Sequence, residues 1–377
     1  QAIAANISDE KVVNISTEGT PRYLGRIIKN VNVKAVTPDW MEQALARSGI
    51  RTHSISVDIT NYVMIELGQP MHAFDLAKIE GSIQVRQAQP QEKLTLLNDQ
   101  EVELQDDIMV IADDQKALAI AGIMGGLDSS VTDDTQDIFL ESAFFAPLAI
   151  AGRARRFGLH TDSSQRYERG VDFELPMIAM HRASELIQAF AGGDFGPITV
   201  AEQTSLLPKR EAIVLKQAQV DQLLGYEVAG DFIADALIRL GCVVETKAQG
   251  EWSVVPPSHR YDMAIYQDLI EEVARIHGYD NIQVSLPKID VKLEKYQDRF
   301  EIAQLRQTIA TLGYQEAISF SFADAKLEKQ LNPNVQPLML ANPISSDLAA
   351  MRSTLLSSLI PCVQYNLNRQ QQRVRFF

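Results

Sequence analysis

Two short proline-containing junctions divide this 377-residue chain into blocks that each carry their own helix and strand patterns. The first junction is at Leu206–Pro208 and the second is at Pro287. Between them, strand-like and helix-like segments alternate over about 75 residues, which is the size of a small independent domain. We therefore expect an α+β multidomain protein, since no helical or strand pattern runs through the whole chain.

The apolar residues are numerous but never form a membrane span. They make up 46% of the chain, enough to bury a sizeable core. The longest nearly apolar stretches, such as Leu118–Leu127, have about half of the ~20 residues that a membrane helix needs. Cys242 and Cys362 lie far apart inside apolar runs, which favours reduced thiols. We expect a cytoplasmic protein that does not enter a membrane. It begins at Gln1 and ends inside strand-like Arg375–Phe377, so we expect a fragment.

The charge balance disfavours broad contact with nucleic acid. Lys and Arg number 35 against 49 Asp and Glu, a net charge of -14, so nucleic acid would have to be held by local basic patches. One such patch is GRARRFGLHTDSSQRYERG, where arginines alternate with aromatic residues that can stack on bases. Its arginines are Arg153, Arg155, Arg156, Arg166 and Arg169. Alternatively, this is a surface loop whose arginines pair with Asp162 and Glu168.

Four carboxylates gather near one predicted helix. Asp268, Glu271 and Glu272 are spaced i, i+3 and i+4, so they share a helix face, and Asp262 lies just upstream. Crowded carboxylates suit Mg²⁺ or Ca²⁺, because a divalent cation relieves their mutual repulsion, and Mg²⁺ needs only one or two carboxylates together with water. The alternative is a solvated acidic face in which Arg275 pairs with Glu271.

Glu141 is the most unusual single residue, because it interrupts the apolar run IFLESAFF. An ionised carboxylate buried without a partner is costly, so Glu141 must pair, take up a proton or meet a ligand. His72 follows Gly68–Pro70 in a loop-like run. Thr60 and Asn61 end a strand-like segment that begins with VDIT. These three residues could line the mouth of a pocket, although a lone histidine is more often structural.

The chemical motifs of several enzyme classes are missing from the sequence. It contains no P-loop, GxSxG elbow, HExxH motif or zinc-spaced cysteine cluster, and the GIMGG segment at Gly122–Gly126 fails the dinucleotide-binding spacing. A magnesium-dependent phosphate-handling enzyme built on Asp262, Asp268, Glu271 and Glu272 remains an alternative, as does nucleic-acid binding by the small middle domain.

Six segments, taken together and in this order, resemble the β subunit of bacterial phenylalanine-tRNA ligase. They are VDITNYVMIELGQPMHAFD, AIAGIMGG, LESAFF, GRARRFGLHTDSSQRYERGVD, PSHRYDMAIYQDLIEEVARIHGYDNI and NPISSDLAAMRSTLL with NLNRQQQRVR. The resemblance implies a residual N-terminal segment at 1–20, a mixed α/β editing domain of the B3/B4 type at 21–203 and a B5-like α+β domain at 204–287. It implies that 288–377 is the incomplete start of a class II synthetase-like α+β domain.

The resemblance also assigns the site residues. It implies that Mg²⁺ is held by Asp262, Asp268, Glu271 and Glu272, on the side toward the catalytic α subunit. It places catalytic roles on His72, Glu141 and Thr161, and it builds the editing pocket from Thr60, Asn61, Gly122, Gly125, Gly126 and Ser163. Ser163 departs from the alanine of related bacterial sequences. Arg153, Arg155 and Arg156 would guide the acceptor end of the tRNA.

The function implied by the resemblance is that of a β subunit in an α2β2 ligase that joins L-phenylalanine to tRNA(Phe) with ATP. The α subunit would carry aminoacylation, so this chain would edit tyrosyl-tRNA(Phe) and not aminoacylate alone. An apolar synthetic pocket rejects an added hydroxyl poorly, which is why a second sieve is needed. Glu141 could accept a hydrogen bond from the phenol, the glycine turn could stabilise an oxyanion, and His72 could orient water or the ribose end. The alternative is a non-enzymatic scaffold and tRNA-guiding module for the α subunit.

Overall fold

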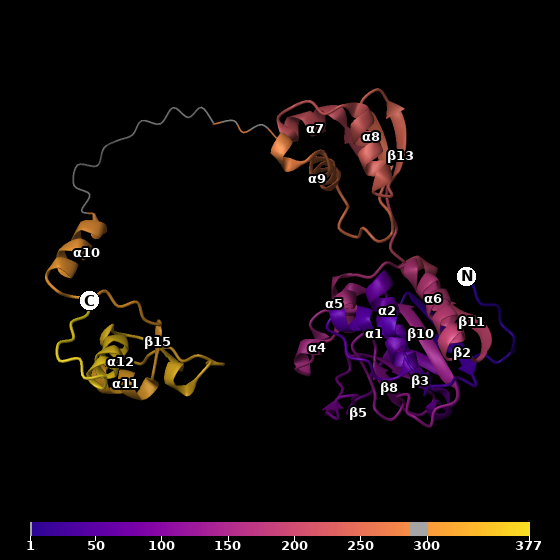
Figure 1. Cartoon of the computed structure of the whole chain (residues 1–377), viewed down its shortest axis with the longest axis horizontal. Helices are drawn as coiled ribbons and strands as arrows, with labels where there is room; N and C mark the ends of the chain where they lie inside the picture. Colours follow the sequence, from indigo (N-terminus) through magenta and orange to yellow (C-terminus); the bar gives the residue numbers. More distant parts are fainter. Residues whose placement is uncertain (1, 283, 285, 287–300) are drawn as a thin grey trace. The chain divides into compact units, whose positions relative to one another are not determined.

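The computed structural model describes residues 2–282, 284, 286 and 301–377. The chain forms two compact units, Gln1–Ser285 and Leu286–Phe377, which are considered separately below. Within the described residues, no helix is long and apolar enough to cross a membrane. Helices and strands mix in both units (Figure 1), which confirms the expected α+β class.

A four-stranded antiparallel sheet forms the centre of the first 203 residues. Its order is β11-β2-β10-β3, and the strands are β2 (Arg22–Lys29), β3 (Met71–Asp75), β10 (Ile138–Phe144) and β11 (Asp194–Glu202). One face is covered by α1 (Asp39–Arg47), α2 (Ile55–Leu67) and α6 (Leu175–Phe190). Helices α2 and α6 lie side by side on that face (Figure 1).

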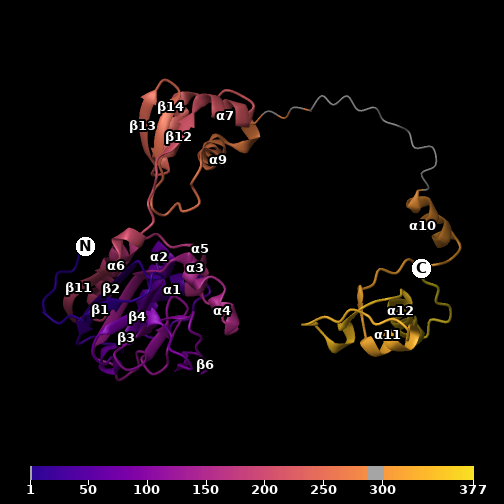
Figure 2. The same ribbon diagram turned by 180° about the vertical axis from the view of Figure 1, so that it is seen from behind.

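A five-stranded sheet packs against the other face. Its order is β1-β4-β7-β8-β9, and the strands are β1 (Val13–Ile15), β4 (Ile83–Gln87), β7 (Met109–Ala112), β8 (Ala117–Ile120) and β9 (Met124–Gly125). Only β1 and β4 run parallel. A small hairpin, β5 (Lys93–Thr95) and β6 (Glu101–Glu103), and the helices α3 (Pro147–Ile150), α4 (Arg153–Arg156) and α5 (Asp162–Arg169) complete the module (Figure 2). This module therefore has one apolar core beneath the helices and another between the two sheets.

Two sequence predictions in this module are wrong, and both concern candidate site residues. The segment VDIT is not a strand, because it lies inside α2. Ile55, Ile59 and Val63 are all fully buried at spacings of four residues, so the helical period outweighs the strand preference of branched side chains. The run around His72 is not a loop, since it forms β3 at the edge of the central sheet.

Residues 213–281 form the second α+β module of this unit. Its antiparallel sheet has the order β12-β14-β13, with strands β12 (Ile213–Lys216), β13 (Val243–Ala248) and β14 (Glu251–Val255). The helices are α7 (Gln217–Leu224), α8 (Gly230–Arg239) and α9 (Tyr266–His277). They enclose a core that includes Cys242, which is free, like Cys362. The predicted alternation of elements is confirmed here.

The second unit consists of short elements. They are α10 (Ile302–Thr311), β15 (Phe322–Ala323), α11 (Ala325–Leu331), β16 (Ala350–Met351) and α12 (Leu356–Leu367), and β15 pairs with β16. The sequence ISFSF at Ile318–Phe322 is typical of a strand, but only Phe322 belongs to β15. Large apolar side chains remain exposed, including Ile318 (95%) and Ile344 (99%).

Candidate functional site

The position of Glu141 follows from the alternation of side chains along β10. Successive residues of a strand point to opposite faces of the sheet. Ile138 and Leu140 join the core beneath the helices, whereas Phe139 and Ala143 join the core between the two sheets. Glu141 therefore faces the space between the sheets.

The neighbouring strands bring two more functional side chains to this space. In β3, His72 stands directly opposite Glu141 in the register. In β2, Tyr23 stands opposite Ala143 and belongs to the core between the sheets. Gly25 is the β2 partner of Glu141, and a Cβ there would run into the ring of Phe139. The antiparallel register thus gathers residues that are distant in the sequence.

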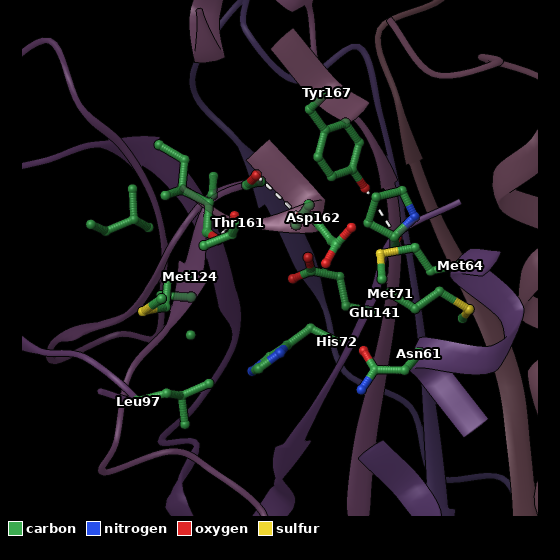
Figure 3. A pocket seen from close by; sticks show the side chains of 18 of the residues that line it. Asn61, Met64, Met71, His72, Leu97, Met124, Glu141, Thr161, Asp162 and Tyr167 are labelled. Carbon is green, nitrogen blue, oxygen red and sulfur yellow. Dashed lines mark hydrogen bonds between the residues drawn. The ribbon is translucent and has the colours of Figure 1, made fainter. Parts of the chain in front are cut away.

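A cavity of about 390 Å³ opens at this place (Figure 3). Its walls come from α2, β3, β8, the turn into β9, β10 and the start of α5. The apolar lining includes Met64, Met71, Leu97, Ile123, Met124 and the ring of Tyr167. The polar lining includes Asn61, His72, Glu141, Thr161, Asp162 and Ser163. An apolar wall with a few convergent polar groups is typical of a small-molecule site.

The Glu141 carboxyl lies at the centre of the labelled side chains in Figure 3, and Glu141 is only 7% exposed. The hydroxyl of Tyr23 donates a hydrogen bond of 2.7 Å to its Oε2 atom. Burial raises the pKa of the Glu141 carboxyl from 4.5 to about 7, although the bond from Tyr23 acts in the opposite direction. Of the three outcomes expected for Glu141, which were to pair, to take up a proton or to meet a ligand, the structure shows the first, a hydrogen bond from Tyr23.

His72 is held as a neutral imidazole. Its ring meets Phe74 edge to face, with the ring centroids 4.4 Å apart. Burial lowers the pKa of His72 from 6.5 to about 4. Its Nε2 atom is buried and has no hydrogen-bond partner among the described residues. Gly125 makes room for the ring, since a Cβ there would lie 2.5 Å from Cε1 of His72. An uncharged imidazole nitrogen is thus free for a water molecule or a ligand.

The start of α5 fixes the glycine turn. The Thr161 hydroxyl donates to the carbonyl of Ile123 at 2.8 Å, and Thr161 also caps the helix by accepting from the N–H of Ser164. The Ser163 hydroxyl donates to the carbonyl of Gly122 at 3.1 Å. Gly122 has a φ of +67°, a conformation that favours glycine. The two hydroxyl groups therefore position the turn, and neither is set up as a nucleophile.

The cavity gathers most of the predicted pocket residues. Asn61, His72, Gly122, Gly125, Glu141, Thr161 and Ser163 all line it. Thr60 and Gly126 do not: the hydroxyl of Thr60 donates to the carbonyl of Val57 within α2, and Gly126 packs against Leu118. Sequence reasoning missed Tyr23 and the wall formed by Tyr167, and no local pattern marks either residue.

Three family models match successive parts of the chain. The B3/4 domain matches residues 19–192, the tRNA synthetase B5 domain matches 213–279, and the phenylalanyl tRNA synthetase beta chain CLM domain matches 282–377. The phenylalanine–tRNA ligase beta subunit of Acinetobacter baylyi is 81% identical over the whole chain. The chain belongs to the phenylalanine–tRNA ligase beta-subunit family.

The match with these relatives covers only part of their length. This chain spans 48% of the Acinetobacter baylyi protein and 45% of the beta subunit of Psychrobacter arcticus, to which it is 54% identical over 96% of its own length. Among solved structures, an N-terminal fragment of the phenylalanyl-tRNA synthetase beta subunit from Pyrococcus horikoshii aligns with 72% of this chain and 76% of that chain. Its identity is 14% and its TM-score is 0.35, too low to inform the fold.

Three of the four carboxylates that the family resemblance assigns to Mg²⁺, Asp262, Asp268 and Glu272, have partners within the protein. Arg260 binds both Asp262, at 2.7 Å, and Glu272, at 3.1 Å. Arg275 pairs with Glu272 at 2.6 Å, and not with Glu271 as the sequence alternative proposed. Asp268 accepts from two backbone N–H groups at the start of α9. Among the described residues no group of three or more His, Cys, Asp or Glu side chains is arranged to hold a metal ion. In this arrangement, arginines occupy carboxylate oxygens of Asp262 and Glu272.

The arginine cluster expected to guide tRNA is largely engaged within the protein. Arg153 donates to the carbonyls of Leu148 and Ala151, and Arg156 pairs with Asp107 at 2.7 Å. Arg166 and Arg169 pair with Asp162 and Glu168, as the sequence alternative expected. Arg155 is exposed, and its side chain makes no ion pair with any described residue. Arg155 is therefore the cluster member best placed to meet a phosphate.

Proposed function

We propose that this chain hydrolyses mischarged tyrosyl-tRNA(Phe) in the cavity around Glu141. One observation carries the proposal: a buried carboxylate faces an aromatic-sized cavity and already accepts a phenol hydroxyl, that of Tyr23. A carboxylate has two oxygens, so it can accept a hydrogen bond from a second phenol hydroxyl. A phenylalanyl group would leave that acceptor without a partner, at a cost of about 1 to 3 kcal/mol.

The hydrolytic step in this proposal uses water and no covalent enzyme intermediate. The Nε2 atom of His72 lacks a partner and can orient a water molecule or the ribose. Backbone N–H groups of the turn from Gly122 to Gly125 would stabilise the oxyanion that develops on the ester carbonyl. Thr161 and Ser163 would hold that turn in place, because their hydroxyls donate to its carbonyls. The catalytic role first assigned to Thr161 thus becomes one of positioning.

In the whole protein, this module would serve an α2β2 phenylalanine–tRNA ligase. The α subunit would join phenylalanine to tRNA(Phe) with ATP, in the cytoplasm and away from membranes. The editing domain is proposed at 21–203, the B5-like domain at 204–287 and the start of the synthetase-like domain at 288–377. Mg²⁺ at Asp262, Asp268, Glu271 and Glu272 remains a prediction that would require Arg260 and Arg275 to leave their carboxylates.

The decisive experiment measures release of tyrosine from tyrosyl-tRNA(Phe) by the purified chain, with phenylalanyl-tRNA(Phe) as the comparison substrate. We expect selective hydrolysis of the tyrosyl ester, and loss of that selectivity in Glu141→Gln. Glu328→Gln is a matched control, since Glu328 is also buried but does not line the cavity. Equal hydrolysis of both esters, or none even with the α subunit and a full-length β subunit, would exclude the proposal.

A scaffold role is the second candidate, and it is favoured by the exposed apolar residues of the second unit. Ile318, Ile344 and Leu338 are largely exposed there, as expected of a surface that binds a partner. The hydrolysis assay distinguishes the two candidate functions, because a scaffold would retain α-subunit binding and would not hydrolyse either ester.

A further inference from the structure

We infer that Tyr23 is a positioning residue for substrate recognition: it holds one oxygen of Glu141 so that the other is presented to the phenol of the tyrosyl ester. This inference rests on the proposed editing function. Tyr23 carries no assigned role in the sequence prediction, and it does not line the cavity, so it acts through Glu141 and not on the substrate.

The geometry of the pair supports a fixed arrangement. Tyr23 is fully buried in the core between the two sheets, and its hydroxyl lies 2.7 Å from Oε2 of Glu141. The two residues sit on adjacent strands that are locked by seven paired positions between β2 and β10. Because the ring of Tyr23 cannot move without disturbing that core, its hydroxyl restricts where the carboxyl group can point.

The bond from Tyr23 also favours the ionised form of Glu141, which can accept a hydrogen bond from the substrate phenol. A hydrogen bond to a carboxylate stabilises its ionised form, and the Tyr23 bond lowers the pKa of Glu141 against the effect of burial. The other titratable or charged side chains at the cavity are His72 on β3, Tyr167 on α5, Asp162 at the start of α5, and Arg51 and His53 just before α2. Burial keeps His72 uncharged near neutral pH, and a tyrosine such as Tyr167 has no cationic form. Arg51 is exposed and makes no ion pair with Glu141 in the described part of the chain, so none of these groups replaces the Tyr23 bond.

The test substitutes Tyr23→Phe, which removes one oxygen and leaves the ring in the core. We expect kcat/KM for tyrosyl-tRNA(Phe) to fall by about tenfold, since a hydrogen bond to a charged group is lost. The rate with phenylalanyl-tRNA(Phe) should stay unchanged, so selectivity falls by the same factor. The pH at which tyrosyl hydrolysis is half-maximal should rise by about one unit. A purely structural defect would lower both rates together and would leave this pH unchanged.

Tyr62→Phe is the matched control. The Tyr62 hydroxyl also donates to a carboxylate, that of Glu66 at 3.1 Å, but neither residue lines the cavity. It should leave selectivity and the pH profile as in the unmodified chain.

A double-mutant cycle distinguishes loss of the bond between Tyr23 and Glu141 from a general effect of misfolding. In a Glu141→Gln background, Tyr23→Phe should change selectivity no further, because the two residues act as one unit. The same selectivity loss in both backgrounds would overturn the inference, as would a Tyr23→Phe protein that edits with unchanged selectivity.

If the unmodified chain fails to hydrolyse tyrosyl-tRNA(Phe) under any condition, the proposed function itself fails. If Tyr23→Phe does not fold, the hydroxyl proton of Tyr23 in the unmodified chain decides: slow exchange with water supports the bond, and fast exchange overturns it.

Discussion

Replacing Glu141 with glutamine should reveal a pH dependence of folding stability that comes from His72. In the unmodified protein, the opposite contribution of Glu141 hides it. The pKa of Glu141 is raised from 4.5 to about 7, so the folded state holds a proton that the unfolded state has lost between these values. Stability therefore falls as the pH rises through this interval. At about 1.4 kcal/mol per pH unit, the full effect is about 3 kcal/mol.

His72 acts in the opposite direction over nearly the same range. Its pKa is lowered from 6.5 to about 4, so the unfolded state holds the extra proton between these values. Stability therefore rises with pH over this interval, again by about 3 kcal/mol. The two contributions nearly cancel in the unmodified protein between about pH 4.5 and 6.5, so its stability should be almost flat there with respect to this pair.

Glu141→Gln removes one contribution and keeps an acceptor for the hydroxyl of Tyr23. We expect the stability of the variant to rise by about 3 kcal/mol between about pH 4 and 6.5, from His72 alone. Urea titrations at several pH values, read by hydrogen exchange in peptides from β2 and β10, isolate this module from the rest of the chain. Parallel pH profiles for the variant and the unmodified chain would refute the reasoning, because they would mean that Glu141 does not titrate in this range.

Three further variants and one ligand test probe other contacts of the same chain. His72→Gln should show the complementary profile, with stability falling between about pH 4.5 and 7; a rise would contradict the sign given for Glu141. Gly125→Ala places a Cβ against the His72 ring and should cost about 1 to 3 kcal/mol in unfolding titrations while lowering editing, and a neutral effect would show that the ring can move. Thr161→Val removes a helix cap and a bond to the turn, so α5 should lose about 1 kcal/mol of protection in hydrogen exchange. Adding Mg²⁺ or a chelator should leave the melting of residues 204–282 unchanged, because Arg260 occupies the carboxylates; stabilisation by Mg²⁺ alone would restore the metal prediction.

The sequence allowed good predictions wherever one segment decides the outcome. The alternation of the small middle domain needed only local periodicity, and its helices and strands follow the predicted order. Glu141 stood out because an apolar strand has no local partner for a carboxylate, and that argument holds in any fold. The same local reasoning failed for VDIT, where branched side chains suggested a strand although the burial of Ile55, Ile59 and Val63 has a helical period.

Partners that lie far apart in the sequence were beyond such reasoning. Tyr23 and Glu141 are separated by 118 residues, and they meet only because β2 and β10 pair in one register. A shift of that register by one residue would turn Tyr23 to the helical face and remove its bond to Glu141.

The carboxylates near α9 also show that a local sequence pattern does not identify the partner of a charged group. Their spacing correctly indicated a crowded acidic surface, but spacing alone does not show which cation neutralises it. Arg260 lies 12 residues before Glu272, and the fold of the intervening loop brings its guanidinium between Glu272 and Asp262. Either a guanidinium or a hydrated Mg²⁺ can neutralise the repulsion between these carboxylates. Which of the two does so depends on the tertiary structure. At both sites the charged residue is evident from the chain, and its partner is decided by the fold.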